Sequence, residues 1–243
     1  MLLQEKTAIV YGAAGPVGAA VAGAFAREGA RVVLAGRTQQ TLAKVADQIR
    51  DAGGTAQAAV VDVTDTAAMR VHAAEVAAAS GGIDIAFNAT SNDDLQGIPL
   101  LDMDLSDFAR PVSKAMATHF TIATVTARHM LGRGGVILAM GGGREAIPQL
   151  GGSHVAWSAL AGLCRQLAAE FGPYGIRVAW LLSPGSPDPG AAPDDGAPLA
   201  GGALIGRRPS YQEVANAAVF AASDWAATMT AAEINLTGGA VID

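Results

Sequence analysis

The sequence has a single cysteine, few aromatic residues and no basic cluster, and the lack of cysteine pairs and of basic clusters excludes internal disulfides and some classes of partner. Its single cysteine, Cys164, has no partner for an internal disulfide and lies in a stretch of small and apolar residues, which favours a packed thiol over a nucleophile. The net charge is −6 and no basic cluster occurs, so nucleic acid and anionic membrane surfaces are poor candidate partners. We therefore expect a small-molecule partner, with no nucleic acid and no membrane.

The N-terminal residues MLLQEKTAIV lead directly into a strand-like run, without a charged leader, a cleavage site or a long apolar segment. These absences predict a cytoplasmic location. What the chain has instead is a hydrophobic content of 51% and 30 glycines. A chain of this length and hydrophobicity can bury a large core without a second domain, so we expect one domain over residues 1–243.

Residues 7–18, TAIVYGAAGPVG, are the most informative stretch. A short apolar run with the composition of a buried strand precedes three glycines, Gly12, Gly15 and Gly18, and an alanine-rich helix follows. A strand, glycine turn and helix N-terminus can take a diphosphate, because glycine allows close approach of the backbone and the helix presents free N–H groups. The alternative is that these glycines only shape a tight turn.

Strand-like runs and helix-length stretches alternate along the rest of the chain. Such crossovers imply parallel pairing, with helices on both faces of the sheet. The predicted fold is α/β, a single-domain Rossmann-type doubly wound parallel sheet whose ligands bind beyond the carboxyl ends of the strands. The expected strands are residues 7–10, 31–35, 56–61, 84–88, 136–140, 177–182 and 233–236, and the expected helices are 19–26, 38–52 with Thr38 as cap, 64–79, 106–131, 153–171 and 211–223.

Several short motifs, in their order and spacing, resemble the short-chain dehydrogenase/reductase family over essentially the whole chain. The first turn is similar to the family's TGxxxGxG pattern, with Tyr11 instead of the threonine and Pro16 instead of the middle glycine. Further matches are Asp62-Val63, Phe87-Asn88-Ala89-Thr90 in place of NNAG, Pro184-Gly185 and Gly238-Gly239. The resemblance implies an oxidoreductase, without a metal, that binds a nicotinamide dinucleotide through Gly12, Gly15, Pro16, Val17, Gly18, Arg37, Asp62, Val63, Asn88, Ala89, Pro184 and Gly185.

The end of the second strand indicates which dinucleotide is bound. An acidic residue there accepts hydrogen bonds from the ribose 2′-OH, whereas an arginine accommodates the 2′-phosphate. This chain has Gly36 at the acidic position and Arg37 next to it. NADP(H) is therefore favoured over NAD(H), with an ordinary solvated arginine as the alternative.

The catalytic residues that the family resemblance implies are missing. The family uses a tyrosine four residues before a lysine, because a phenol becomes a usable acid or base when an ammonium stabilises its anion. The chain has only three lysines, Lys6, Lys44 and Lys114, and none follows a tyrosine at that spacing. The family also uses a serine upstream of the tyrosine and an asparagine on the preceding long helix. Alignment with the family places Ser153 at the position of the tyrosine and Trp157 at that of the lysine. It places the glycines at 141–143 at the position of the serine and Ala115 at that of the asparagine.

Two residues at the start of the same helix are weak candidates for a replacement proton donor. A histidine can donate a proton at neutral pH without a lysine, which makes His154 chemically the better acid. Ser153, however, is the one expected to face the pocket, because adjacent helix positions diverge by about 100°. A packed position without a role is expected for His119. A surface ion pair is expected for Arg144-Glu145, with contact to a polar substrate as the alternative. Thr90 adds a side chain where the family has glycine near the cofactor.

Residues 183–209 hold six of the eleven prolines and lack apolar periodicity, which is typical of a lid over a substrate site, with Asp194-Asp195 at its tip. The family resemblance also implies a dimer or tetramer formed through the alanine-rich helices. Three hypotheses follow. The first is an NADP(H)-dependent oxidoreductase that has an unusual proton donor or acts on a substrate, such as an imine or an activated alkene, that asks less of one. The others are a non-redox enzyme such as a lyase or cyclase, and a catalytically silent binding or partner subunit.

Overall fold

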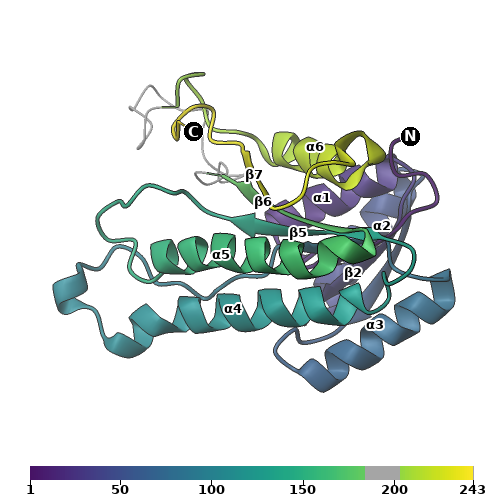
Figure 1. The fold of residues 1–243 in the computed structure, drawn as a ribbon, viewed down its shortest axis with the longest axis horizontal. Coiled ribbons are helices and arrows are strands. Elements are labelled where there is room, and N and C mark those ends of the chain that lie inside the picture. The colour runs from purple at the N-terminus through teal and green to yellow at the C-terminus, as the bar shows by residue number, and fades with distance from the viewer. Residues whose placement is uncertain (184–202, 243) are drawn as a thin grey trace.

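The computed structural model describes residues 1–183 and 203–242, which form a seven-stranded parallel sheet with helices on both faces (Figure 1). The strand order is β3-β2-β1-β4-β5-β6-β7, and every neighbouring pair is parallel. The predicted doubly wound fold is therefore confirmed. The strands are β1 (Thr7–Tyr11), β2 (Arg31–Gly36), β3 (Thr55–Val60), β4 (Ile85–Asn88), β5 (Gly135–Gly141), β6 (Ile176–Leu182) and β7 (Ala232–Asn235).

The helices cover the two faces in groups of three, and each group has its own apolar core. Helices α1 (Pro16–Arg27), α2 (Gln39–Asp51) and α6 (Tyr211–Ala222) pack on one face, and α3 (Thr66–Ser80), α4 (Leu105–Ala127) and α5 (Ser153–Phe171) pack on the other. Side chains of a strand alternate between the faces, so Ala8 and Val10 belong to the first core while Ile9 and Tyr11 belong to the second.

The end of α4 and the capping of α2 differ from the sequence-based expectation. Helix α4 ends at Ala127 instead of residue 131, because the bonds from His129 N to Thr126 O and from Met130 N to Ala127 O close tighter turns than a helix does. Gly132 and Gly134 then follow with positive φ. Thr38 does occupy the N-cap of α2, but its side chain makes no capping hydrogen bond. No helix within the described residues is both long and apolar enough to cross a membrane.

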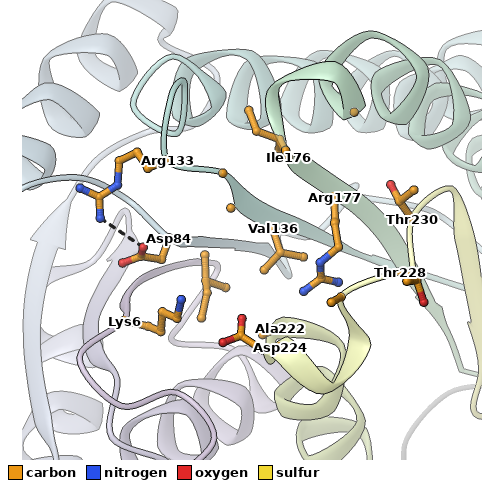
Figure 2. Close-up of a pocket in the computed structure, with 16 residues that line it drawn as sticks. Lys6, Asp84, Arg133, Val136, Ile176, Arg177, Ala222, Asp224, Thr228 and Thr230 are labelled. Carbon is orange, nitrogen blue, oxygen red and sulfur yellow. Dashed lines mark hydrogen bonds and ion pairs between the residues drawn. The ribbon is translucent and has the colours of Figure 1, made fainter.

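Charged side chains hold the amino edge of the sheet together around a cavity of about 420 Å³ (Figure 2). The half-buried Arg177 at the start of β6 donates to the carbonyls of Ala221, Ser223 and Met229, which ties the end of α6 to the sheet. Asp84 accepts from the backbone N–H of Thr7 and pairs with Arg133. These side chains satisfy backbone groups of the fold, and ligands of a doubly wound sheet bind at the opposite, carboxyl edge.

Candidate functional site

The glycine turn between β1 and α1 passes so close to other backbone that side chains are excluded at two positions. Gly12 has φ +77°, and a Cβ there would lie 2.5 Å from the carbonyl oxygen of Ala89, just after β4. A Cβ on Gly18 would lie 2.3 Å from the carbonyl oxygen of Gly12. A Cβ on Gly15 would lie 3.4 Å from the carbonyl oxygen of Gly12, which is an ordinary contact. The turn therefore requires Gly12 and Gly18 but has room for a methyl group at Gly15.

The first turn of α1 presents backbone donors at the carboxyl edge. Gly15 is the N-cap and brings no capping side chain, and Pro16 at the first helical position has no N–H. The first helical bond runs from Ala19 N to Gly15 O at 2.8 Å, so the N–H groups of Val17 and Gly18 lie ahead of it, where a helix supplies no acceptor. These two donors and the positive end of the helix fit a diphosphate.

Arg37 and Asp62 lie side by side because they follow adjacent parallel strands. The bond from Val61 N to Gly36 O, 2.8 Å long, continues the β2 to β3 pairing up to this point. Hydrogen bonds from the backbone N–H and the hydroxyl of Thr64 lower the pKa of Asp62, and the charge of Arg37 adds to the effect. Arg37 itself is exposed, so its guanidinium is available to a phosphate, while Val63 is buried against α3.

Asn88 at the end of β4 joins the sheet to α4. Its side-chain oxygen accepts from the backbone N–H and the hydroxyl of Thr90, so its amide nitrogen faces Nδ1 of His119 at 2.8 Å. Nδ1 must then accept, which places the imidazole proton on Nε2. Burial lowers the pKa of His119 to about 4, so the ring is neutral near pH 7. His119 is thus a packed residue, as expected, and it positions the side chain of Asn88. The next residue, Ala89, donates its N–H to the carbonyl oxygen of Tyr11 at the end of β1.

Ser153, the first residue of α5, lies in a polar cluster that sequence reasoning missed. Its side chain is buried, and its hydroxyl donates to Asp94 Oδ2 at 2.8 Å and accepts from Gln96 Nε2 at 3.0 Å. Gln96 also donates to Asp94 Oδ2 at 2.8 Å. The polar stretch after β4 was the available signal, but no local pattern indicates which residue, 57 or 59 positions away, it contacts.

Three buried polar atoms at the carboxyl edge have no hydrogen-bond partner among the described residues. They are Nδ1 of His154, Oδ1 of Asn92 in the loop after β4, and Oγ of Ser183 directly after β6. Buried polar groups normally have a partner, so such unpaired atoms are typical of a site that binds a polar molecule. His154 is half-buried, and no hydrogen bond connects it to the cluster around Ser153 in the described structure.

Trp157 and Arg144 line a separate cavity of about 280 Å³ between α5 and the end of the sheet. The indole of Trp157 packs on Gly142, where a Cβ would come within 2.2 Å of it. Arg144 pairs at 2.5 Å with Glu233 of β7, a carboxylate that also accepts from the indole N–H of Trp180. Arg144 therefore forms an ion pair, as expected, but its partner is the mostly buried Glu233, which is distant in sequence. The sequence does not indicate this partner.

The remaining residues that the sequence analysis named are either buried in the fold or lie outside the described residues. Ala115 is buried inside α4. Cys164 is buried, and burial raises the pKa of its thiol to about 12, so it is the packed thiol that the sequence predicts. Within the described chain, no group of three His, Cys, Asp or Glu side chains is arranged to hold a metal ion. Pro184, Gly185, Asp194-Asp195 and most of the expected lid lie outside the described residues.

We predict that replacing His119 with glutamine flattens the pH dependence of stability. The unfolded chain takes up the His119 proton at an ordinary pKa of about 6.5, whereas the folded protein resists it until about pH 4. Stability is therefore lost as the pH falls through this window, by roughly 3 kcal/mol from this residue. Urea unfolding at pH 7 and pH 4 should show a smaller decline for His119→Gln, and equal declines would contradict the assignment.

Gly18→Ala tests the close approach of the turn. The added methyl group would meet the carbonyl of Gly12, so we expect a loss of about 1–3 kcal/mol in the free energy of unfolding. The matched control is Gly23→Ala in the same helix, where no atom lies within 4 Å and alanine should add about 0.5–1 kcal/mol. Chemical denaturation would measure both, and a neutral Gly18→Ala would disprove the constraint.

Comparisons with known proteins agree with this geometry. The family model described as enoyl-(acyl carrier protein) reductase matches residues 12–241. The chain is 32% identical over 251 residues to the D-threitol dehydrogenase of Mycolicibacterium smegmatis, covering 99% of this chain and 94% of that protein. It is also 32% identical over 257 residues to the A-factor type gamma-butyrolactone 1′-reductase of Streptomyces virginiae, covering 99% and 97%.

Solved structures are similar over the whole chain as well. A short-chain dehydrogenase/reductase from Serratia marcescens has a TM-score of 0.87 at 28% identity and covers 98% of this chain and 99% of its own. A short-chain dehydrogenase from Burkholderia cenocepacia, solved in complex with NADP, has a TM-score of 0.85 at 28% identity and covers 99% of each chain. The chain belongs to the short-chain dehydrogenase/reductase family, an oxidoreductase family that acts on small molecules.

Proposed function

We propose that the protein is an NADP(H)-dependent oxidoreductase that interconverts a small alcohol and its carbonyl compound without the tyrosine and lysine of its family. The observation that carries the proposal is the pairing of a diphosphate cradle, made by the N–H groups of Val17 and Gly18, with an exposed Arg37 at the end of β2. The NADP in the Burkholderia cenocepacia relative supports it. So do the alcohols named for two relatives, the D-threitol dehydrogenase and the cis-4-hydroxycyclohexanecarboxylate dehydrogenase of Sinomonas cyclohexanicum, which is 31% identical over 242 residues.

The chain offers groups for each part of the cofactor. The turn at Gly12, Gly15 and Pro16 would hold the diphosphate with Val17 and Gly18, Arg37 would bind the 2′-phosphate, and Asp62 and Val63 would border the adenine. Asn88 and Ala89 would border the nicotinamide, together with Pro184 and Gly185. The bound cofactor would supply or accept the hydride. The protein would orient the substrate and handle the proton, with Ser153 the better placed of the two candidate donors and His154 beside it.

A silent or non-redox protein on the same fold is the second candidate. The observation that favours it is Trp157, whose indole packs on Gly142 where the family has lysine and offers one N–H donor instead of an ammonium. Binding of NADPH without turnover of any alcohol or carbonyl compound would support this candidate.

Replacing Arg37 with alanine tests the cofactor preference. NADPH should raise the melting temperature of the native protein more than NADH does, because a ligand stabilises the fold according to its affinity. Loss of a charged phosphate contact worth about 1.5–3 kcal/mol should weaken NADPH binding roughly 10- to 100-fold in Arg37→Ala and leave NADH unchanged.

The matched control for this experiment is Arg31→Ala, at the exposed opposite end of the same strand, which should bind both dinucleotides like the parent protein. A parent protein that is stabilised better by NADH than by NADPH would contradict the preference.

We also propose that the protein is a cytoplasmic dimer or tetramer that associates through α4 and α5. The apolar side chains of Phe120 and Val155 on these helices are 54% and 41% exposed. Covering them would remove apolar surface from water. Sedimentation velocity should therefore show a dimer or tetramer whose dissociation Phe120→Glu promotes, and a monomer at micromolar concentration would contradict the proposal.

A further inference from the structure

The cluster of Ser153, Asp94 and Gln96 lies where a substrate of the proposed function would meet the protein. Helix α5 follows β5 and runs back along the sheet, so its first residue, Ser153, lies at the carboxyl edge (Figure 1). The loop after β4 crosses this helix end and is fixed there by a 2.9 Å bond from Gly97 N to Gln149 O. Asp94 and Gln96 are thereby held against Ser153 at the same edge as the cofactor cradle.

The directions of the hydrogen bonds make Ser153 a link between a substrate and a carboxylate. An ionised carboxylate accepts only, so the Ser153 hydroxyl must give its one proton to Asp94 Oδ2, 2.8 Å away. Gln96 donates to one lone pair of the same hydroxyl at 3.0 Å. The second lone pair of Ser153 Oγ remains for an incoming O–H donor. A serine alone is a poor base, but a serine hydrogen-bonded to a carboxylate can pass a proton on.

The burial of the two groups suits such a transfer. Ser153 is only 1% exposed, whereas Asp94 and Gln96 are exposed. The pair therefore has one end inside the protein and one end in contact with water, which can exchange the carboxyl proton after each turnover.

The neighbouring titratable groups have other partners or have no hydrogen bond to the cluster among the described residues. Asp93 is paired with Lys114. His119 is held neutral against Asn88. His154 has no hydrogen bond to the cluster in the described structure, and its side chain diverges by about 100° from that of Ser153. Among the groups around the start of α5, Asp94 is thus the carboxylate in direct contact with Ser153.

We propose that Asp94 is the proton acceptor of this site and works through Ser153, an inference that rests on the proposed function. The alcohol O–H bond breaks as its proton moves to Ser153 Oγ, while the Ser153 proton moves to Asp94 Oδ2. Bound NADP⁺, which the turn at Gly12 to Gly18 and Arg37 would hold, would supply the oxidant for the hydride of the carbinol carbon, so the alcohol would lose two electrons and become a carbonyl compound. Asp94 then releases the proton to water. Carbonyl reduction is the reverse.

The test compares Asp94→Asn, Asp94→Ala and Ser153→Ala with the parent protein. Turnover of NADP⁺ is measured with D-threitol and with cis-4-hydroxycyclohexanecarboxylate, the substrates named for two relatives. We expect each variant to lower kcat on the order of 100-fold or more, as expected for loss of a general base. NADPH affinity, measured by fluorescence titration, should stay unchanged. The matched control is Asp93→Asn, which removes the adjacent carboxylate and should keep kcat.

Chemical rescue separates proton transfer from a structural role. Sodium formate should restore part of the activity of Asp94→Ala, because it supplies a carboxylate in the vacated space, but it should not rescue Ser153→Ala. The double variant Asp94→Asn with Ser153→Ala should be no slower than either single variant, since residues that act as one unit are not additive.

Four results would overturn the proposal. They are full activity of Asp94→Asn, loss of activity without formate rescue of Asp94→Ala, loss of NADPH affinity together with activity, and an inactive parent protein that still binds NADPH. In the last case the cofactor site of the proposed function would stand. A parent protein that binds neither NADPH nor NADH would instead overturn the proposed function itself.

Discussion

The structure depends on the close approach of three backbone segments at the turn after β1. Gly12 lies against the carbonyl of Ala89 after β4, and Gly18 lies against the carbonyl of Gly12. Two missing Cβ atoms thus let the start of α1 reach the position where the strand order reverses, between β1 and β4. In a doubly wound sheet this reversal opens the crevice in which ligands bind. The same approach brings the donors of α1 and the polar loop after β4 to one edge.

The polar groups at the two edges of the sheet have different roles. At the amino edge, Arg177 and Asp84 satisfy backbone groups, which makes that cavity part of the fold. At the carboxyl edge, buried atoms of His154 and Ser183 lack partners within the described residues, and Ser153 faces Asp94. Unpaired buried polar atoms destabilise a fold, so the presence of these atoms at the carboxyl edge agrees with a site that a ligand completes.

Local patterns were sufficient to predict the fold but not the polar contacts of the site. The strands, the helices and the need for Gly12 and Gly18 follow from residue type and spacing within a few turns of chain. The contact of Ser153 with Asp94 and that of Arg144 with Glu233 join residues far apart in sequence, and they depend on how separate loops pack. The early end of α4 at Ala127 was missed because a composition suited to helix continues up to the glycines that turn the chain.

The central claim is that a retained dinucleotide cradle faces a serine and carboxylate pair in place of a tyrosine and lysine. A crystal structure of the protein with NADP⁺ tests it most directly. The account predicts the diphosphate on the N–H groups of Val17 and Gly18, the 2′-phosphate on Arg37, and the nicotinamide beside Ser153 with Asp94 behind it. A nicotinamide that lies away from Ser153, or a tyrosine and a lysine that converge on it from elsewhere in the chain, would contradict the account.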